Sequence, residues 1–133
     1  MNQIFVKIDG VTGTGTGAHH GWLVVSSAQL SSPDKNSVVI SRVYDRLSST
    51  LFKLFKDGTT IPAVTIDFVK GGRLVMRLEL ASVLIAELYP VSGHPPMESI
   101  TLHYTGARTV QGTTASSAAE VGTAWSLAEQ RRG

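Results

Sequence analysis

The stretch IPAVTIDFVKGGRLVMRLEL, residues 61–80, decides the fold. Val64, Ile66 and Phe68 alternate with smaller or polar residues, and a period of two is typical of a β-strand that buries one face. The Gly-Gly pair in the middle is typical of a tight hairpin turn. We therefore predict two antiparallel strands, residues 61–69 and 73–80, that form a hairpin.

Further strands are expected on both sides of this hairpin. They are predicted at residues 4–9, 22–30, 38–44, 83–89, 100–105 and 124–127. Residues 90–97 predict a loop because three prolines remove backbone donors. Residues 110–120 are small and polar, which predicts a loop or a weak strand. Seven or eight short strands separated by turns are typical of a sandwich or a closed barrel.

One segment has helical rather than strand periodicity. Apolar residues between Leu47 and Phe55 recur at helical spacing, which predicts an amphipathic helix. Ser48 or Ser49 is expected to cap its N-terminus, and Gly58 to follow its C-terminus. A helix of about ten residues is marginal alone, so it must dock on the sheet.

Composition bounds the class of protein. The 133 residues are 42% hydrophobic and 17% charged, which is typical of a globular domain. Twelve basic and ten acidic side chains give a net charge of +2, so nothing points to nucleic acid. There is no cysteine, which excludes a disulfide framework. We predict one mostly β domain over residues 1–133, a barrel or sandwich of seven to eight short antiparallel strands with one flanking helix at about 48–57.

Targeting signals are weak in this sequence. No apolar run reaches the roughly 18 to 20 residues that span a bilayer. The first nine residues lack the basic and long apolar regions of a secretory signal. We therefore expect a product that is made in the cytoplasm and does not insert stably in a membrane.

Motifs for catalysis and cofactor binding are also weak. Residues 13–18 formally match a dinucleotide fingerprint, but that mechanism needs a following helix, and a strand is expected instead; a mobile surface loop is predicted. His19 and His20 point apart on an extended segment, so they are expected to be solvated rather than metal ligands. Carboxylates such as Asp67 and Glu98 are scattered and predict turns, caps or exposed positions. The sequence predicts no enzyme, no metal and no cofactor.

Two features concern charge and uncovered strand faces. The arginines are spread along the chain and predict solvated faces or salt bridges: Arg42, Arg46, Arg73, Arg77 and Arg108.

In residues 22–30, apolar side chains occur on both faces, whereas a lone barrel buries one side of each strand. We therefore expect the helix and a second subunit to cover the rest.

Three stretches resemble a known family when they are taken in order and spacing. They are residues 4–13 with the loop ending in His19-His20-Gly21-Trp22, residues 44–58 from Tyr44-Asp45-Arg46 through the helix to Asp57-Gly58, and residues 61–104. Together they are similar to Hcp, the tube protein of bacterial type VI secretion systems. The resemblance covers most of residues 4–105. It is looser over 110–133, where Trp125 matches a late tryptophan of the family.

The resemblance implies a β-barrel with a flanking helix, similar to phage tail-tube proteins, that closes into hexameric rings. The rings stack into a hollow tube inside a contractile sheath, and contraction drives the tube and its spike protein into a neighbouring cell. The lumen carries and protects small effector proteins. The protein would be cytoplasmic before firing and secreted without a cleaved signal peptide.

Ser27 and Gln29 are the candidate effector-binding residues. They share a polar face of the strand at 22–30, and we hypothesise that this face lines the lumen. The loops at 10–21 and 31–36 are expected at ring edges, although relatives often carry a longer glycine-rich segment at the second position. Two alternatives stay open: a non-polymerising carrier or chaperone of the same fold, and a small β-barrel ligand-binding protein or enzyme.

Overall fold

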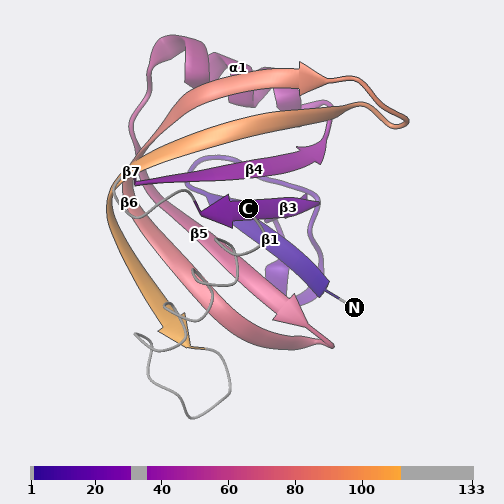
Figure 1. Cartoon of the computed structure of the whole chain (residues 1–133), viewed down its shortest axis with the longest axis vertical. Helices are drawn as coiled ribbons and strands as arrows, with labels where there is room; N and C mark the ends of the chain where they lie inside the picture. Colours follow the sequence, from indigo (N-terminus) through magenta and orange to yellow (C-terminus); the bar gives the residue numbers. More distant parts are fainter. Residues whose placement is uncertain (1, 31–35, 112–133) are drawn as a thin grey trace.

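The computed structural model describes residues 2–30 and 36–111, which form one antiparallel sheet and a helix (Figure 1). Seven strands lie in the order β2-β1-β5-β6-β7-β4-β3. They are β1 (Asn2–Ile8), β2 (Leu23–Val25), β3 (Ser27–Leu30), β4 (Ser37–Val43), β5 (Ile61–Lys70), β6 (Arg73–Val91) and β7 (Met97–Gln111). The helices are a short 3₁₀ turn, η1 (Gly17–His19), and α1 (Leu47–Asp57). The predicted mostly β fold with one flanking α-helix is confirmed.

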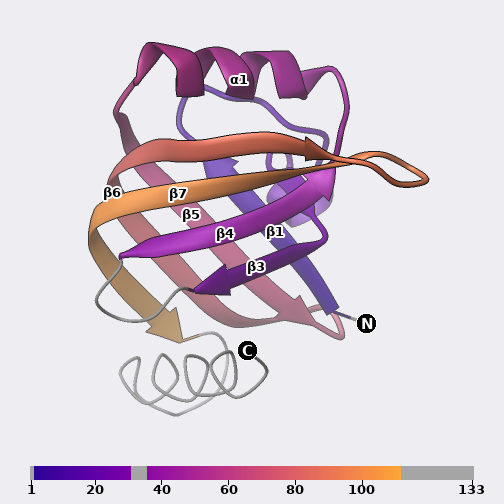
Figure 2. The ribbon, with the colours of Figure 1, turned by 45° about the horizontal axis from the view of Figure 1, so that its top comes forward.

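The sheet nearly closes into a barrel through the segment that was predicted as one strand, residues 22–30 (Figure 2). β2 pairs with β1, whereas β3 pairs with β4 at the other edge of the sheet. Ser26 lies between them, and its N–H donates to the carbonyl of Ser41 at 2.8 Å. The single-strand prediction is wrong because the chain changes partner at Ser26, and this change joins the two edges of the sheet.

The predicted hairpin at residues 61–80 is confirmed. Lys70 pairs with Arg73, and Gly71 and Gly72 have φ angles of 59° and 79°. Positive φ at both central residues is the geometry of the two-residue turn that matches strand twist. The sequence stretch therefore encodes both the strands and their register.

β6 is longer than predicted, since it merges the strands expected at 73–80 and 83–89 and continues to Val91. β7 begins at Met97, so the predicted loop at 90–97 shrinks to residues 92–96. Past Val83, the described pairing of β6 is with β7 only. Proline is tolerated in such an edge strand, which explains why Pro90 does not end it. The turn at 92–96 projects beyond the barrel (Figure 1).

The core lies inside the barrel, and α1 covers one end of it (Figure 2). Leu51 of α1 and Ile66, Met76, Val83 and Leu102 of the strands are fully buried. The helix spans 47–57 and ends at Gly58, whose φ is 63° and whose N–H bonds the carbonyls of Leu54 and Phe55, as predicted. The short helix is therefore stabilised by docking its apolar stripe.

The predicted N-cap at Ser48 or Ser49 is wrong. Asp45 Oδ1 accepts the Leu47 N–H at 2.9 Å instead, and the Ser48 hydroxyl is turned into the buried interior. Ser49 bonds the Arg46 carbonyl. The predicted strand at 124–127 and most of the segments at 110–120 and 31–36 lie outside the described residues.

Candidate functional site

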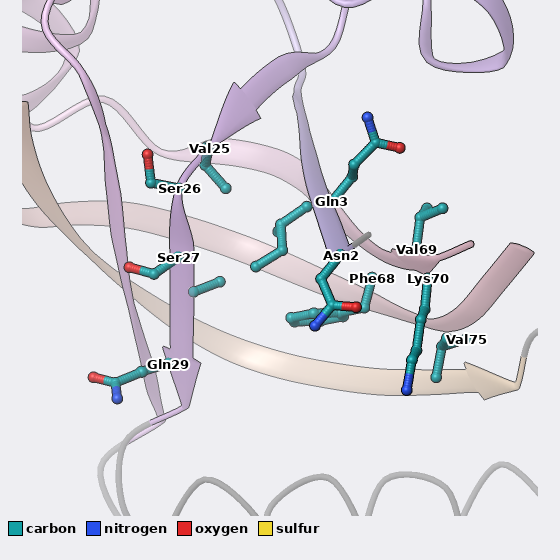
Figure 3. A pocket seen from close by; sticks show the side chains of 12 residues that line it. Asn2, Gln3, Val25, Ser26, Ser27, Gln29, Phe68, Val69, Lys70 and Val75 are labelled. Atoms are coloured by element: carbon teal, nitrogen blue, oxygen red, sulfur yellow. The ribbon is translucent and has the colours of Figure 1, made fainter. Parts of the chain in front are cut away.

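Ser27 and Gln29 lie on β3 and are exposed. Their side chains point to the same side of the strand, away from Phe68 and Lys70 (Figure 3). Ala28 between them is buried, with 5% of its surface exposed. The predicted pair therefore shares the outward face of the barrel wall.

That outward face continues across four strands, because residues directly opposite each other in a sheet share a face. One row across β3, β4, β7 and β6 consists of Ser27, Ser41, Ser99 and Tyr89. The next row consists of Gln29, Val39, Thr101 and Glu87. We call these eight residues the outer face. Apart from Val39 and the buried Ser99, it exposes hydroxyl and amide groups and a single carboxylate, which suits polar contact with another protein.

Sequence reasoning found two of these eight positions. The other six belong to strands that are distant in the sequence, and they join Ser27 and Gln29 only through the register of β3 with β4 and β4 with β7. A period of two identifies which residues of one strand share a face. It does not identify which strand lies beside which.

A pocket of about 660 Å³ opens at one end of the barrel, along β3, and the predicted residues Ser27 and Gln29 contribute to its rim. Its apolar lining is Ile4, Val25, Ala28, Phe68, Val69 and Val75. Polar residues surround this lining, among them Asn2, Gln3 and Lys70 (Figure 3). We call it the end pocket. The end pocket therefore fits an apolar group that lies next to a negatively charged or polar group.

His19 and Asp67 depart most from expectation. Asp67 is fully buried rather than at a turn or an exposed position, and it accepts hydrogen bonds from Arg77 at 2.7 and 2.9 Å. His19 Nε2 lies 2.8 Å from Asp67 Oδ2, and its ring stacks on Phe5 with centroids 4.1 Å apart. The hydrogen bond with Asp67 raises the pKa of Arg77. His19 is thus a structural contact that fastens its loop to the barrel, not a solvated side chain.

The glycine-rich loop that contains His19 is tightly folded. Gly13 N–H bonds the Gly21 carbonyl at 2.7 Å, and Gly15 N–H bonds the Trp22 carbonyl at 2.8 Å. A Cβ on Gly13 would lie 2.4 Å from the Trp22 carbonyl oxygen. These glycines allow the two sides of the loop to approach closely. The predicted mobile loop is in fact a loop whose backbone is held by its own hydrogen bonds.

A second buried ion pair joins α1 to β4 and β7. Arg42 and Glu98 are 3% and 0% exposed, and Arg42 Nη1 donates to Glu98 Oε2. The Ser48 hydroxyl donates to the same oxygen at 2.9 Å, and Arg42 Nη2 lies 2.8 Å from Asp45 Oδ1. The exposed position predicted for Glu98 is wrong. The predicted arginine salt bridges are confirmed for Arg42, and also for Arg77 and Arg108.

Within residues 2–30 and 36–111, no group of three His, Cys, Asp or Glu side chains is arranged to hold a metal ion. None of the helices in that part of the chain is long and apolar enough to cross a membrane.

Comparison with known proteins identifies the family. The family described as "Type VI secretion system effector, Hcp" matches residues 5–110. The structure of Hcp2 from Salmonella typhimurium is similar with a TM-score of 0.75 at 23% identity, over 82% of this chain and 86% of that one. A type VI secretion system effector from Yersinia pestis has a TM-score of 0.74 at 20% identity, over 81% and 88%. The anti-feeding prophage baseplate, a 6-fold symmetrised cryo-EM structure, has a TM-score of 0.52 at 12% identity, over 85% and 94%.

A comparison with curated protein sequences returns no match. At identities below 25%, the solved structures establish the fold alone. The family match establishes the family, because it covers residues 5–110, from β1 into β7. The Hcp family consists of secreted structural proteins of the type VI secretion system. The chain therefore belongs to the Hcp family of the type VI secretion system.

Proposed function

We propose that this chain forms hexameric rings that stack into the inner tube of a type VI secretion system. The observation that carries the proposal is the number of large apolar side chains exposed on a small barrel. These are Val24, Val43, Tyr44, Phe52, Leu84, Tyr89 and Val91, each 39% to 51% exposed. Apolar surface of this kind marks contacts with other proteins. The 6-fold symmetrised baseplate of similar fold supports six as the number of copies.

The lumen of the ring is lined by the part of the outer face that lies on β3, β4 and β7, with Ser27 and Gln29 as effector contacts. Its hydroxyl and amide groups exchange hydrogen bonds with many protein surfaces, and this part of the face carries no acidic or basic side chain. Such a surface holds cargo loosely enough to release it. Residues 1–133 act as one structural domain without enzymatic activity. Their partners are other copies, the sheath and spike proteins and effectors, and the protein is cytoplasmic before firing and extracellular afterwards.

The oligomeric mass of the purified protein tests ring formation. Light scattering should give six times the subunit mass of 14.2 kDa, and negative-stain images should show an open centre. Tubes at high concentration would separate the tube protein from a non-polymerising carrier. A stable monomer at every concentration would contradict the proposal.

Gln29→Arg tests the lumen assignment. Six added cations around one ring should repel basic cargo and change effector retention by at least about fivefold, if each cargo contact loses roughly 1 kcal/mol. The control is Lys56→Glu, a charge change on the exposed side of α1. Unchanged ring assembly together with unchanged effector retention would remove Gln29 from the lumen.

A further inference from the structure

The two ends of β6 carry different surfaces. The strand starts at the turn with β5, residues 70–73, and ends at the turn with β7, residues 92–96. In both views the two turns lie on the same side of the barrel, the turn at 92–96 beside the end that α1 covers and the turn at 70–73 at the other end (Figures 1 and 2). We call residues 87–97 the hairpin end. The end pocket lies beside the other turn, since Lys70 and Val75 help to line it.

The hairpin end is apolar and lacks cations. Tyr89 and Val91 are 51% and 41% exposed. Val91 pairs with Met97, and Met97 pairs with Val43, so three apolar side chains form a row across β6, β7 and β4. Residues 84–99 contain no lysine or arginine and two acidic residues, of which Glu87 is exposed.

The opposite end of the barrel has the complementary character. Residues 68–78 contain no acidic side chain and three cationic ones, of which Arg77 is paired with Asp67. Lys70 and Arg73 are exposed on the turn, and the end pocket beside them has an apolar lining that includes Phe68 and Val75. An apolar projection with a negative flank fits an apolar pocket with a positive rim.

We propose that the hairpin end of one copy docks into the end pocket of the next copy, head to tail along the axis of the tube. The inference rests on the proposed function and adds to it which surfaces connect one ring to the next. A head-to-tail contact between two different surfaces does not close on itself, so repetition generates a filament.

The hairpin end is held in place before it docks. Arg42 and Glu98 form their buried ion pair in the row that also contains Pro90. The Tyr44 N–H donates to the Pro96 carbonyl at 2.9 Å, which fixes the turn to the end of β4. A preorganised projection loses little conformational entropy on docking.

Chemical cross-linking tests which surfaces meet. The chain has no cysteine, so Val91→Cys and Lys70→Cys proteins can be mixed and treated with a short bismaleimide under tube-forming conditions. Each copy then carries one thiol, and only contacts between copies are recorded. The matched control mixes Val91→Cys with Lys56→Cys on α1. We expect a yield of the 91–70 product at least about tenfold above the control.

Charge and polarity variants test whether the contact matters. Val91→Asp, and separately the double variant Lys70→Glu/Arg73→Glu, should leave rings intact and lower the tube population at least about tenfold. Adding Glu87→Lys to the double variant restores complementarity and should recover tubes. Lys56→Glu is the control for charge alone.

The outcomes separate this inference from the function on which it rests. Wild-type protein that forms neither rings nor tubes overturns the proposed function. Wild-type tubes that persist in both variants, together with a 91–70 cross-link no stronger than the control, overturn the docking proposal and leave the tube function standing.

Discussion

Glu98→Ala removes a carboxylate that is fully buried beside Arg42. The guanidinium of Arg42, 3% exposed, would keep only Asp45 as a charged partner, and the Ser48 hydroxyl would lose its acceptor. Breaking a buried pair by removing one partner costs about 3–5 kcal/mol. We therefore expect a loss of roughly 4 kcal/mol in the free energy of unfolding, a large share of the 5–15 kcal/mol typical of a domain.

The double variant Arg42→Met/Glu98→Leu separates the cost of an unpaired charge from the value of the pair. Replacing both charges by apolar side chains leaves no uncompensated ion, so the double variant should be more stable than Glu98→Ala by about 2 kcal/mol or more. Urea unfolding, followed by fluorescence at one subunit concentration where every variant is monomeric, measures this. A loss below about 1 kcal/mol for Glu98→Ala would refute the reasoning. So would a double variant whose loss in the free energy of unfolding equals the sum of the losses of the Arg42→Met and Glu98→Leu single variants.

Three further predictions concern the core, the loop and pH. Leu51→Ala, at a side chain with 0% exposure, should cost about 2–5 kcal/mol in thermal or urea unfolding; a loss under about 1 kcal/mol would mean that α1 does not seal the barrel. Gly13→Ala should raise amide hydrogen exchange at Gly15 and Gly21, because its Cβ would lie 2.4 Å from a carbonyl oxygen; unchanged protection would contradict the close approach. Burial raises the pKa of Tyr104 above its ordinary value of 10.0, so its contribution to stability is intact below pH 10 and is lost as the pH rises further; a loss of stability at alkaline pH that is the same in Tyr104→Phe would contradict this.

Local patterns predicted the parts of the fold that depend on neighbours in sequence. The hairpin at Gly71-Gly72, the α1 stripe and the stop at Gly58 each depend on residues less than a dozen positions apart. The partners in the buried ion pairs, by contrast, lie far apart in the sequence. His19 meets Asp67 across 48 positions and Arg42 meets Glu98 across 56, so a carboxylate in a strand pattern reads as exposed until its partner is known. For the same reason, the sequence did not predict six of the eight residues on the outer face, which lie on strands distant from β3 in the sequence.

The misreading of β6 as two strands has a local physical cause. Its inward side chains occupy even positions at Met76, Leu78 and Leu80, then odd positions at Val83 and Ile85. Ser82, with φ of 52°, lies at the change of phase. A single continuous alternation is therefore absent from the sequence, although the backbone pairing with β7 continues through both halves.

The second irregularity of β6 reverses the first. The register with β7 shifts between Ile85 and Glu87, and beyond it the exposed side chains are again at odd positions, Tyr89 and Val91. Because alternation has a period of two, one phase change alone would turn these two side chains toward the barrel interior and bring Leu88, which packs against the core, outward. The shift at 85–87 is thus what places the apolar row of the hairpin end outside while its neighbours on β7 and β4, Glu98 and Arg42, stay inside. An inserted or deleted residue between 82 and 87 should therefore exchange the two faces of the hairpin end while the register from Met76 to Leu80 is kept.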